Sequence, residues 1–181
     1  MHTAYIGMGA NLPSRAGQPE ATLAAAALRL ESLGRVICRS SLYSTEPVGF
    51  AEQPRFVNAV VALETALEPR ELLKGLLAIE SEFGRDRAAG FANGPRALDL
   101  DILLFDNFKI GEAGLEIPHP RLAERAFVLV PLNEIAPELV DAVSGRTVSQ
   151  LLRSLCDGAS SESEANAVVA IQSDSWRPGA C

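Results

Sequence analysis

The sequence predicts an α+β fold, a ferredoxin-like (split βαβ) antiparallel sheet with helices packed on it in a single-layer sheet α/β sandwich. Two patterns predict this fold. Apolar residues recur at every second position in some segments, as in strands, and with a helical period in the segments between them. In chain order these segments run strand, helix, strand, strand, helix, strand, which is the order of a split βαβ unit. The 181 residues suffice for one domain with a sizeable core.

The N-terminal half supplies three of the predicted strands. Residues 4–8 form the first, and an alanine- and leucine-rich helix follows over about 19–33, before Gly34, a typical glycine at a helix end. Further strands are predicted over 36–45 and 56–67. The segment between these two strands contains two prolines and a glycine, which favour a loop.

The C-terminal half adds a fourth strand and more helices. Pro69 stands in the first turn of a helix that leucines and an isoleucine at helical spacing predict up to about residue 83. The remaining expectations are a loop over 84–94, the strand over 98–105, an irregular hairpin over 107–116, and helical stretches over 121–135 and 147–155.

The last part of the chain differs in composition from the rest. Residues from about 157 onward are rich in Ser, Ala and Glu, although residues 167–171 are apolar enough to dock somewhere. Such a composition buries little apolar surface. We therefore expect a domain over residues 1–155 and a mobile C-terminal extension over 156–181.

The strand over 98–105 carries two carboxylates in an otherwise apolar segment. The two-residue period divides it into one face with Leu98, Leu100, Ile102 and Leu104 and another with Asp99, Asp101, Leu103 and Phe105. Both carboxylates are thus expected to point the same way. Because apolar residues occupy both faces further along, the strand is expected to be internal to the sheet.

This pair of carboxylates is compatible with a site for divalent metal. Mg²⁺ prefers carboxylate oxygens, keeps several waters and is often shared with substrate phosphates. Carboxylates two residues apart on a strand can also serve two metals about 4 Å apart, as in two-metal phosphoryl chemistry. An isolated Asp-x-Asp equally fits a solvated strand end, so the neighbouring residues have to decide.

Those neighbours are rich in arginine. The chain has only two lysines, whereas five arginines flank the aspartate strand, namely Arg85, Arg87, Arg96, Arg121 and Arg125. Arginine grips phosphate oxygens with two parallel hydrogen bonds and stacks on flat rings. Alternatively, the same arginines would simply neutralise acidic side chains on the surface. No lysine follows a phosphate-binding glycine loop, so a bound nucleotide would be held by arginines and metal.

Composition and charge exclude several other classes. A net charge of −7 argues against general nucleic-acid binding, which requires a broad basic field. No apolar run approaches the roughly 20 residues of a membrane span, and the N-terminus does not resemble a signal peptide, so we expect a cytoplasmic protein. The three cysteines lack metal-ligand spacing, which predicts reduced thiols, no disulfide framework and no zinc.

Five ordered motifs identify a family. They are YIGMGANL at 5–12, SLYSTEPVG at 41–49, QPRFVNA at 53–59, GPRALDLD at 94–101, and IPHPR at 117–121 followed by ERAF at 124–127. Together they closely resemble the 6-hydroxymethyl-7,8-dihydropterin pyrophosphokinases of the folate pathway, over about residues 4–155. The resemblance implies transfer of a pyrophosphoryl group from ATP to the pterin hydroxymethyl oxygen, with release of AMP.

The resemblance also implies roles for individual residues. Two Mg²⁺ ions would be held by Asp99 and Asp101, and catalysis would involve these two together with Arg85, Arg96 and His119. The residues implied for ATP are Glu80, Arg87, Arg96, Ile102, His119 and Arg125. Those implied for the pterin are Thr45, Val48, Phe56, Asn58, Asp99 and Phe127, with the two rings enclosing it. ATP and the pterin would be the partners of a monomer that binds neither nucleic acid nor membrane.

Departures from the family pattern leave alternatives open. Asn93 stands where many relatives have a tryptophan, and Gly114 and Glu116 stand where a polar or basic residue is common. These changes put one nucleotide contact in doubt but leave the metal site intact. The alternatives are a noncatalytic module that binds a nucleotide or RNA, and a different Mg²⁺-dependent nucleotidyl or phosphoryl transferase.

Overall fold

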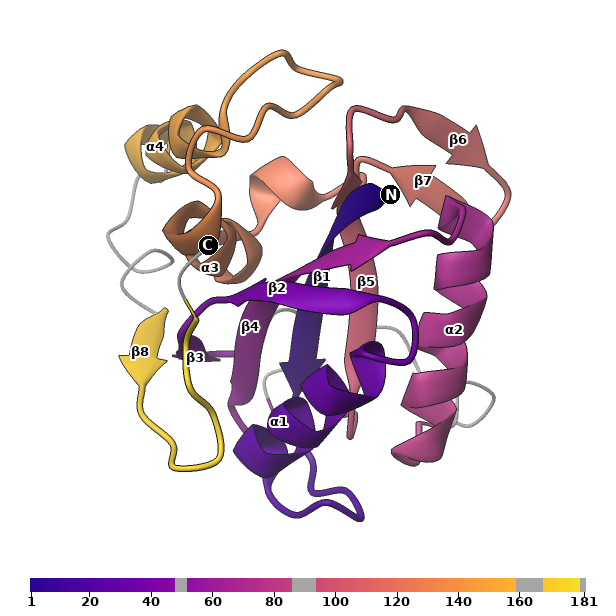
Figure 1. Ribbon diagram of the computed structural model, residues 1–181. Helices are drawn as coiled ribbons and strands as arrows, with labels where there is room; N and C mark the ends of the chain where they lie inside the picture. Colours follow the sequence, from indigo (N-terminus) through magenta and orange to yellow (C-terminus); the bar gives the residue numbers. More distant parts are fainter. Residues whose placement is uncertain (48–51, 86–93, 159–167, 180–181) are drawn as a thin grey trace.

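The computed structural model describes residues 1–47, 52–85, 94–158 and 168–179. The first half of the chain forms β1 (His2–Ala10), α1 (Pro19–Leu30), β2 (Arg35–Arg39), β3 (Leu42–Thr45), β4 (Phe56–Thr65) and α2 (Pro69–Glu82). The second half forms β5 (Asp99–Phe105), β6 (Ile110–Glu112), β7 (Leu115–Ile117), a 3-10 turn at Leu122–Glu124, α3 (Ala126–Ile135), α4 (Val148–Gly158) and β8 (Val169–Ile171). The predicted α+β fold is confirmed (Figure 1).

One sheet organises the molecule. Its strands run in the order β5-β1-β4-β3-β8, and β2 pairs with the part of β4 beyond β3; all of these pairings are antiparallel. The predicted strand over 36–45 is therefore two strands, β2 and β3. Ser40 lies between them, where its N–H donates to Val60 O and its Oγ accepts from Val60 N.

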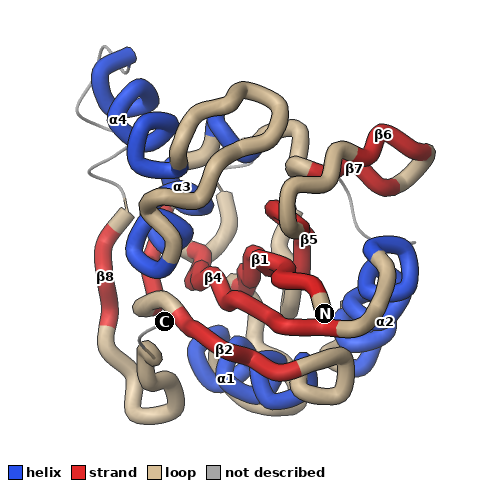
Figure 2. The backbone as a smooth tube through the Cα atoms, turned by 45° about the horizontal axis from the view of Figure 1, so that its top comes forward, coloured by secondary structure: helices blue, strands red, loops and turns tan. Residues whose placement is uncertain are grey.

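The two faces of the sheet are covered differently. Helices α1 and α2 pack on one face, over a core that includes Ile6 and Leu63, with Leu30 and Leu72 from the helices (Figure 1). Helices α3 and α4 lie on the other face, where α3 contacts β3 and β4 (Figure 2). Among the described helices, none is long and apolar enough to cross a bilayer.

The aspartate strand, β5, lies at an edge of the sheet, so the expectation of an internal strand is wrong. Its inner side pairs with β1. Part of its outer side is covered by the segment after β7, where His119 N–H donates to Leu103 O at 2.9 Å. Apolar residues occupy both faces of β5 because α2 packs on one face and the 3-10 turn and α3 lie toward the other, not because strands flank it on both sides.

A bulge in β5 also changes the predicted faces. The register with β1 shifts between Tyr5 and Ile6, whose partners are Leu104 and Ile102, so Leu103 has no partner of its own. Ile102 therefore shares a face with Leu98 and Leu100, as predicted. Leu104 lies in the opposite core, and Phe105 lies in the core on the α1 and α2 side. An extra residue in one strand reverses the alternation beyond it.

The C-terminal extension is partly a packed element. Residues 168–179 return to the sheet, where β8 pairs with β3 and the Trp176 side chain is buried. The expectation of a mobile extension is thus wrong for these residues, and the weaker expectation that residues 167–171 dock is met over 168–171. The expectation of reduced thiols is also wrong for Cys38, which is disulfide-bonded, whereas Cys156 is a free thiol.

At the end of β5, Asp106 anchors the N-terminus. Its carboxylate accepts from Thr3 N at 2.8 Å and contacts His2 Nδ1 at 2.7 Å. Burial opposes the charge of this carboxylate, but these hydrogen bonds outweigh burial and lower the pKa of Asp106.

A group whose pKa is lower in the folded state stabilises the fold at pH values above its unfolded pKa, and this contribution disappears as the pH falls through its folded pKa. We therefore expect Asp106→Asn to lower the free energy of unfolding by about 1 kcal/mol at pH 7 and by less near pH 3. Urea denaturation at the two pH values measures this. An equal effect at both would show that the charge of Asp106 contributes nothing.

Candidate functional site

Two glycines leave a space on the sheet face that α3 and α4 only partly cover. Two glycines of β1 lie in register between functional side chains, because Gly9 pairs with both Asn58 and Asp99, and Gly7 pairs with both Val60 and Asp101. Residues paired across a sheet project from the same face. A Cβ at Gly9 would lie 3.1 Å from Asn58 Oδ1, so glycine leaves the space between Asn58 and Asp99 open.

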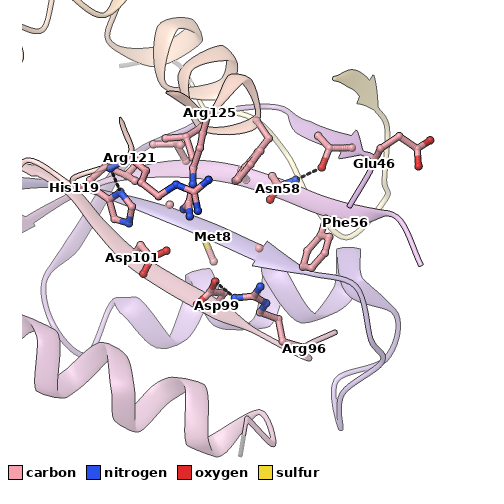
Figure 3. Close-up of a pocket in the computed structure, with 18 of the residues that line it drawn as sticks. Met8, Glu46, Phe56, Asn58, Arg96, Asp99, Asp101, His119, Arg121 and Arg125 are labelled. Carbon is pink, nitrogen blue, oxygen red and sulfur yellow. Dashed lines mark hydrogen bonds and ion pairs between the residues drawn. The ribbon is translucent and has the colours of Figure 1, made fainter. Parts of the chain in front are cut away.

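A cavity of about 300 Å³ lies above these glycines. Figure 3 shows side chains from β4, β5, α3 and the segments beside them converging on it. Most of the site residues expected from the sequence line it, and these are Thr45, Phe56, Asn58, Arg85, Arg96, Asp99, Asp101, His119, Arg125 and Phe127.

Asp99 is held by two arginines. Arg96 Nη1 donates to Asp99 Oδ2 at 2.7 Å, and Arg85 Nη1 donates to Asp99 Oδ1. Arg85 also pairs with Glu80 at 2.5 Å, a carboxylate that accepts from Leu100 N and is almost fully buried. Burial opposes the charge of Arg85, but Asp99 and Glu80 outweigh burial and raise its pKa. Both arginines are therefore held by ion pairs at the edge of the cavity.

Asp101 lies in a different electrostatic environment from Asp99. Burial, and after it the charges of Asp99 and Glu80, raise the pKa of Asp101 to about 6. Its carboxylate is therefore destabilised in the metal-free protein, and a cation between Asp101 and Asp99 would relieve the repulsion. Two carboxylates facing one cavity are a donor set that suits Mg²⁺, which takes one or two carboxylates and completes its shell with water and phosphate.

The opposite wall of the cavity is positive. Burial, together with the neighbouring Arg121, lowers the pKa of Arg125 below its usual range, although the side chain stays charged. Among the residues that the structure describes, none forms an ion pair with Arg125. Asp101 and Asp99 attract Arg125 from beyond ion-pair distance. A cation that no described carboxylate contacts directly, and that lies beside a cavity, favours an anionic ligand.

His119 adds a neutral donor to this wall. Burial and the charge of Arg125 lower the pKa of His119, so the imidazole is neutral near pH 7. Its Nδ1 accepts from Arg121 N–H at 3.1 Å (Figure 3). In the neutral ring the proton therefore resides on Nε2, which remains available to a ligand.

One end of the cavity suits a flat ring with polar edges. Phe56 and Phe127 line it, and Arg96 and Arg125 lie over their rings, each 5.5 Å from the ring centroid. Asn58 Nδ2 donates to Thr45 Oγ1 at 2.8 Å, which fixes the orientation of the amide. An oriented amide between aromatic side chains can recognise a heterocycle by both stacking and hydrogen bonding.

A second cavity of about 210 Å³ lies on the other side of Asp101 and His119, which line both cavities. Its other lining residues include Leu73, Ile102 and Leu115. Its rim carries Gly114 and Glu116, the two departures noted in the sequence. The site thus has two compartments that meet at one aspartate and one histidine.

Three of the expected site residues are not among the described residues that line the two cavities. Glu80 lines neither cavity and instead forms a buried ion pair with Arg85, which does line the first cavity. Val48 and Arg87 lie outside the described residues. Gly7 and Gly9 were not predicted as site residues. Their role becomes visible only from the register that places them beside Asn58 and the aspartates.

Comparisons with known proteins agree with this geometry. A model of the family described as 7,8-dihydro-6-hydroxymethylpterin-pyrophosphokinase (HPPK) matches residues 5–137. A 2-amino-4-hydroxy-6-hydroxymethyldihydropteridine pyrophosphokinase of Methylorubrum extorquens is 42% identical over 157 residues, covering 86% of this chain and 94% of the relative. The protein of the same name from Pseudomonas aeruginosa is 45% identical over 148 residues, covering 82% and 88%.

A solved structure supports the fold. Wild-type Plasmodium falciparum HPPK-DHPS with pteroate superimposes with a TM-score of 0.73 at 17% identity, over 93% of this chain. The chain spans about half of that solved chain, 47% of its length.

Proposed function

The chain belongs to the 7,8-dihydro-6-hydroxymethylpterin-pyrophosphokinase family, and from this membership we propose which of its residues hold the substrates and the metal. The enzyme transfers pyrophosphate from ATP to the hydroxymethyl group of 6-hydroxymethyl-7,8-dihydropterin, giving the pterin diphosphate and AMP in folate biosynthesis. The observation that carries the proposal is the pair of cavities that meet at Asp101 and His119.

The pterin would occupy the first cavity, between Phe56 and Phe127. Its ring would stack on these side chains, while Asn58 and Thr45 would read its polar edge. Val48, expected to contribute to this edge, is kept as part of the proposal. The hydroxymethyl group would then point along the sheet toward Asp99 and Asp101.

ATP would place its nucleoside in the second cavity, against Leu73 and Ile102, and its phosphates across the wall that the two cavities share. Arg125 and the Nε2–H of His119 would bind phosphate oxygens there. Arg85 and Arg96, paired with Asp99 in the free protein, would exchange this carboxylate for phosphate oxygens as metal takes their place. Arg87 would add to them, and Glu80 would act by holding Arg85.

Asp99 and Asp101 would hold two Mg²⁺ ions. When bound, the metal neutralises phosphate charge and lowers the pKa of the attacking hydroxyl group. The chain itself positions the hydroxyl oxygen near the β-phosphorus, excludes water with the aromatic end of the cavity, and stabilises the transferred group with charged arginines. Positioning and charge stabilisation supply most of the catalysis of phosphoryl transfer. No strong protein base is required in this scheme.

Product analysis tests the reaction itself. The protein would be incubated with ATP, Mg²⁺ and the reduced hydroxymethylpterin, followed by mass analysis and phosphorus resonance. We expect AMP and a pterin diphosphate. ADP with a pterin monophosphate would reveal a different phosphoryl transferase, and nucleotide binding without turnover would favour a noncatalytic module.

The placement of the pterin has its own test. Asn58→Ala should raise the KM for the pterin about tenfold, because a paired heterocycle edge would lose its partner, and should leave the KM for ATP near its original value. Asn133→Ala serves as the control, since this amide on α3 contacts Ser149 outside either cavity. An unchanged KM for the pterin in the Asn58 variant would contradict the placement.

We also propose that the enzyme acts as a monomer in the cytoplasm and binds neither nucleic acid nor membrane. The described residues proposed for ATP and for the pterin all belong to one chain. Sedimentation analysis at micromolar concentration would test the monomer.

A further inference from the structure

We propose that the C-terminal segment 168–179, here called the strap, is a positioning element for the pterin end of the site. The strap lies beyond residues 5–137, which the family model matches, and it contributes no residue to either cavity. Its contacts nevertheless reach the strand that carries Thr45. This inference rests on the proposed placement of the pterin beside Thr45 and Asn58.

The strap makes β3 an inner strand. β8 pairs with β3 through Leu42 with Ile171, Tyr43 with Ala170, and Ser44 with Val169. Figure 1 shows β8 alongside β3, on the side away from β4. β3 has only four residues, and without β8 it would form the edge of the sheet at this point. A short edge strand has exposed backbone hydrogen bonds and opens locally more easily than an inner strand.

Trp176 anchors the strap immediately before β3. Its side chain is 4% exposed and packs in the same core as Leu42. Its indole N–H donates to Ser40 O at 2.8 Å, and Arg39 lies over its ring at 5.7 Å. Arg39 and Gly179 exchange two backbone hydrogen bonds of 3.3 and 3.1 Å. The anchor therefore fixes residues 39–42, the junction between β2 and β3.

The position of β3 determines the geometry of the recognition pair. Tyr43 pairs with Asn58 across the sheet, and Thr45 at the end of β3 accepts from the Asn58 amide in the cavity. On the sheet face that α3 covers, Glu134 of α3 also holds β3. The Glu134 carboxylate accepts hydrogen bonds from Ser41 N and from Tyr43 OH. The strap and Glu134 thus fix one short strand from its edge and from its face. If β3 shifts, Thr45 no longer orients the Asn58 amide.

This role separates the strap from ATP binding. Among the described residues, those proposed for the phosphates and the nucleoside are Leu73, Arg85, Arg96, Ile102, His119 and Arg125. The strap forms no strand pairing or hydrogen bond with any of these six. Loosening β3 should therefore weaken the pterin end of the site selectively. A strap that only stabilised the fold would instead reduce the amount of active enzyme without changing either KM.

The test uses Trp176→Ala in the full-length chain. We expect the KM for the pterin to rise about fivefold or more, with the KM for ATP unchanged. The reason is that Thr45 and Asn58, which the variant would displace, are proposed to contact only the pterin. Trp176→Phe should retain most of the burial and give a smaller rise. Val169→Ala is the control, because this side chain on β8 is half exposed and its backbone pairing with Ser44 is kept.

Assays are run well below the unfolding temperature of each variant, and calorimetry of pterin binding with a non-hydrolysable ATP analogue measures affinity directly. A lower kcat with both KM values unchanged, or an equal rise of both, would overturn the inference. The Asn58→Ala variant separates the two proposals: if it leaves the pterin KM unchanged, the placement of the pterin fails. If Asn58→Ala raises the pterin KM and Trp176→Ala does not, the strap inference alone fails.

The same residue supplies a second readout in the unaltered protein. Trp176 is the only tryptophan of the chain, so its fluorescence reports the docking of the strap. In a urea titration we expect this fluorescence and the pterin affinity to change together, at or before the loss of helical circular dichroism. Loss of pterin affinity while the tryptophan signal is still native would overturn the inference.

Discussion

Asp101→Ala is expected to reduce kcat about 10³-fold or more while leaving the metal-free fold at least as stable as before. Activity falls because one of the two carboxylates proposed for Mg²⁺ is lost. Stability does not fall, because the Asp101 carboxylate is buried beside Asp99 and Glu80, which raises its pKa to about 6.

The pH dependence of this effect has a definite sign. A carboxyl group whose folded pKa lies above its unfolded value destabilises the fold when it ionises, so the penalty is absent below about pH 4 and complete above about pH 6. Without metal, the variant should therefore exceed the original protein in stability at pH 7, and the gap should close near pH 4. Thermal unfolding in a chelator at the two pH values measures this.

Asp106→Asn is a matched control for activity, since it removes a carboxylate at the other end of β5, outside both cavities. It should keep the original kcat. Asp101 is a cleaner test than Asp99, whose loss would leave Arg85 and Arg96 without their shared partner. A kcat near the original value in Asp101→Ala would remove the proposed metal site.

Glu80→Ala should have the largest effect on stability. Its carboxylate is 1% exposed, pairs with Arg85 and accepts from Leu100 N, so the variant leaves a charge and a backbone donor with fewer partners. Breaking a buried ion pair costs about 3 kcal/mol or more. We also expect kcat to fall about tenfold, because Arg85 loses its support, and Glu80→Gln to recover part of both losses.

Glu82→Ala provides the comparison on the same helix. Its carboxylate lies on the surface and pairs with Arg29 and Arg15, and such exposed pairs contribute little. Urea denaturation and steady-state kinetics of the three variants separate the two positions. Equal destabilisation at residues 80 and 82 would show that the buried pair has no special role.

The elements of the fold follow from local patterns, which is why they were predictable. The helix over 69–82 and the strand that carries the aspartates are predicted by the period of their apolar residues. The metal site that Asp99 and Asp101 suggest stays a prediction. Except for Arg85, the expected site residues that line the first cavity come from motifs whose spacing carries the family resemblance. Local sequence is enough for these because each depends on a few neighbouring residues.

Features that depend on pairing over long distances were not predictable. The edge position of β5 and its bulge at Leu103 are set by β1, almost a hundred residues earlier in the chain. The strap was expected to be mobile because its composition is polar, yet one tryptophan and a three-residue strand dock it. Glu80 is similar: this carboxylate is buried among apolar helix positions because Arg85 and the Leu100 N–H donate hydrogen bonds to it.

The shared wall of the two cavities has a consequence for ligand design. Because Asp101 and His119 line both compartments, a heterocycle in one and a nucleoside in the other could be joined by a short linker through this wall. Linking two binding groups makes the second contact intramolecular and can raise affinity by about 10²-fold or more when the linker fits. In a bisubstrate inhibitor the linker would thus take the place proposed for the ATP phosphates at this shared wall.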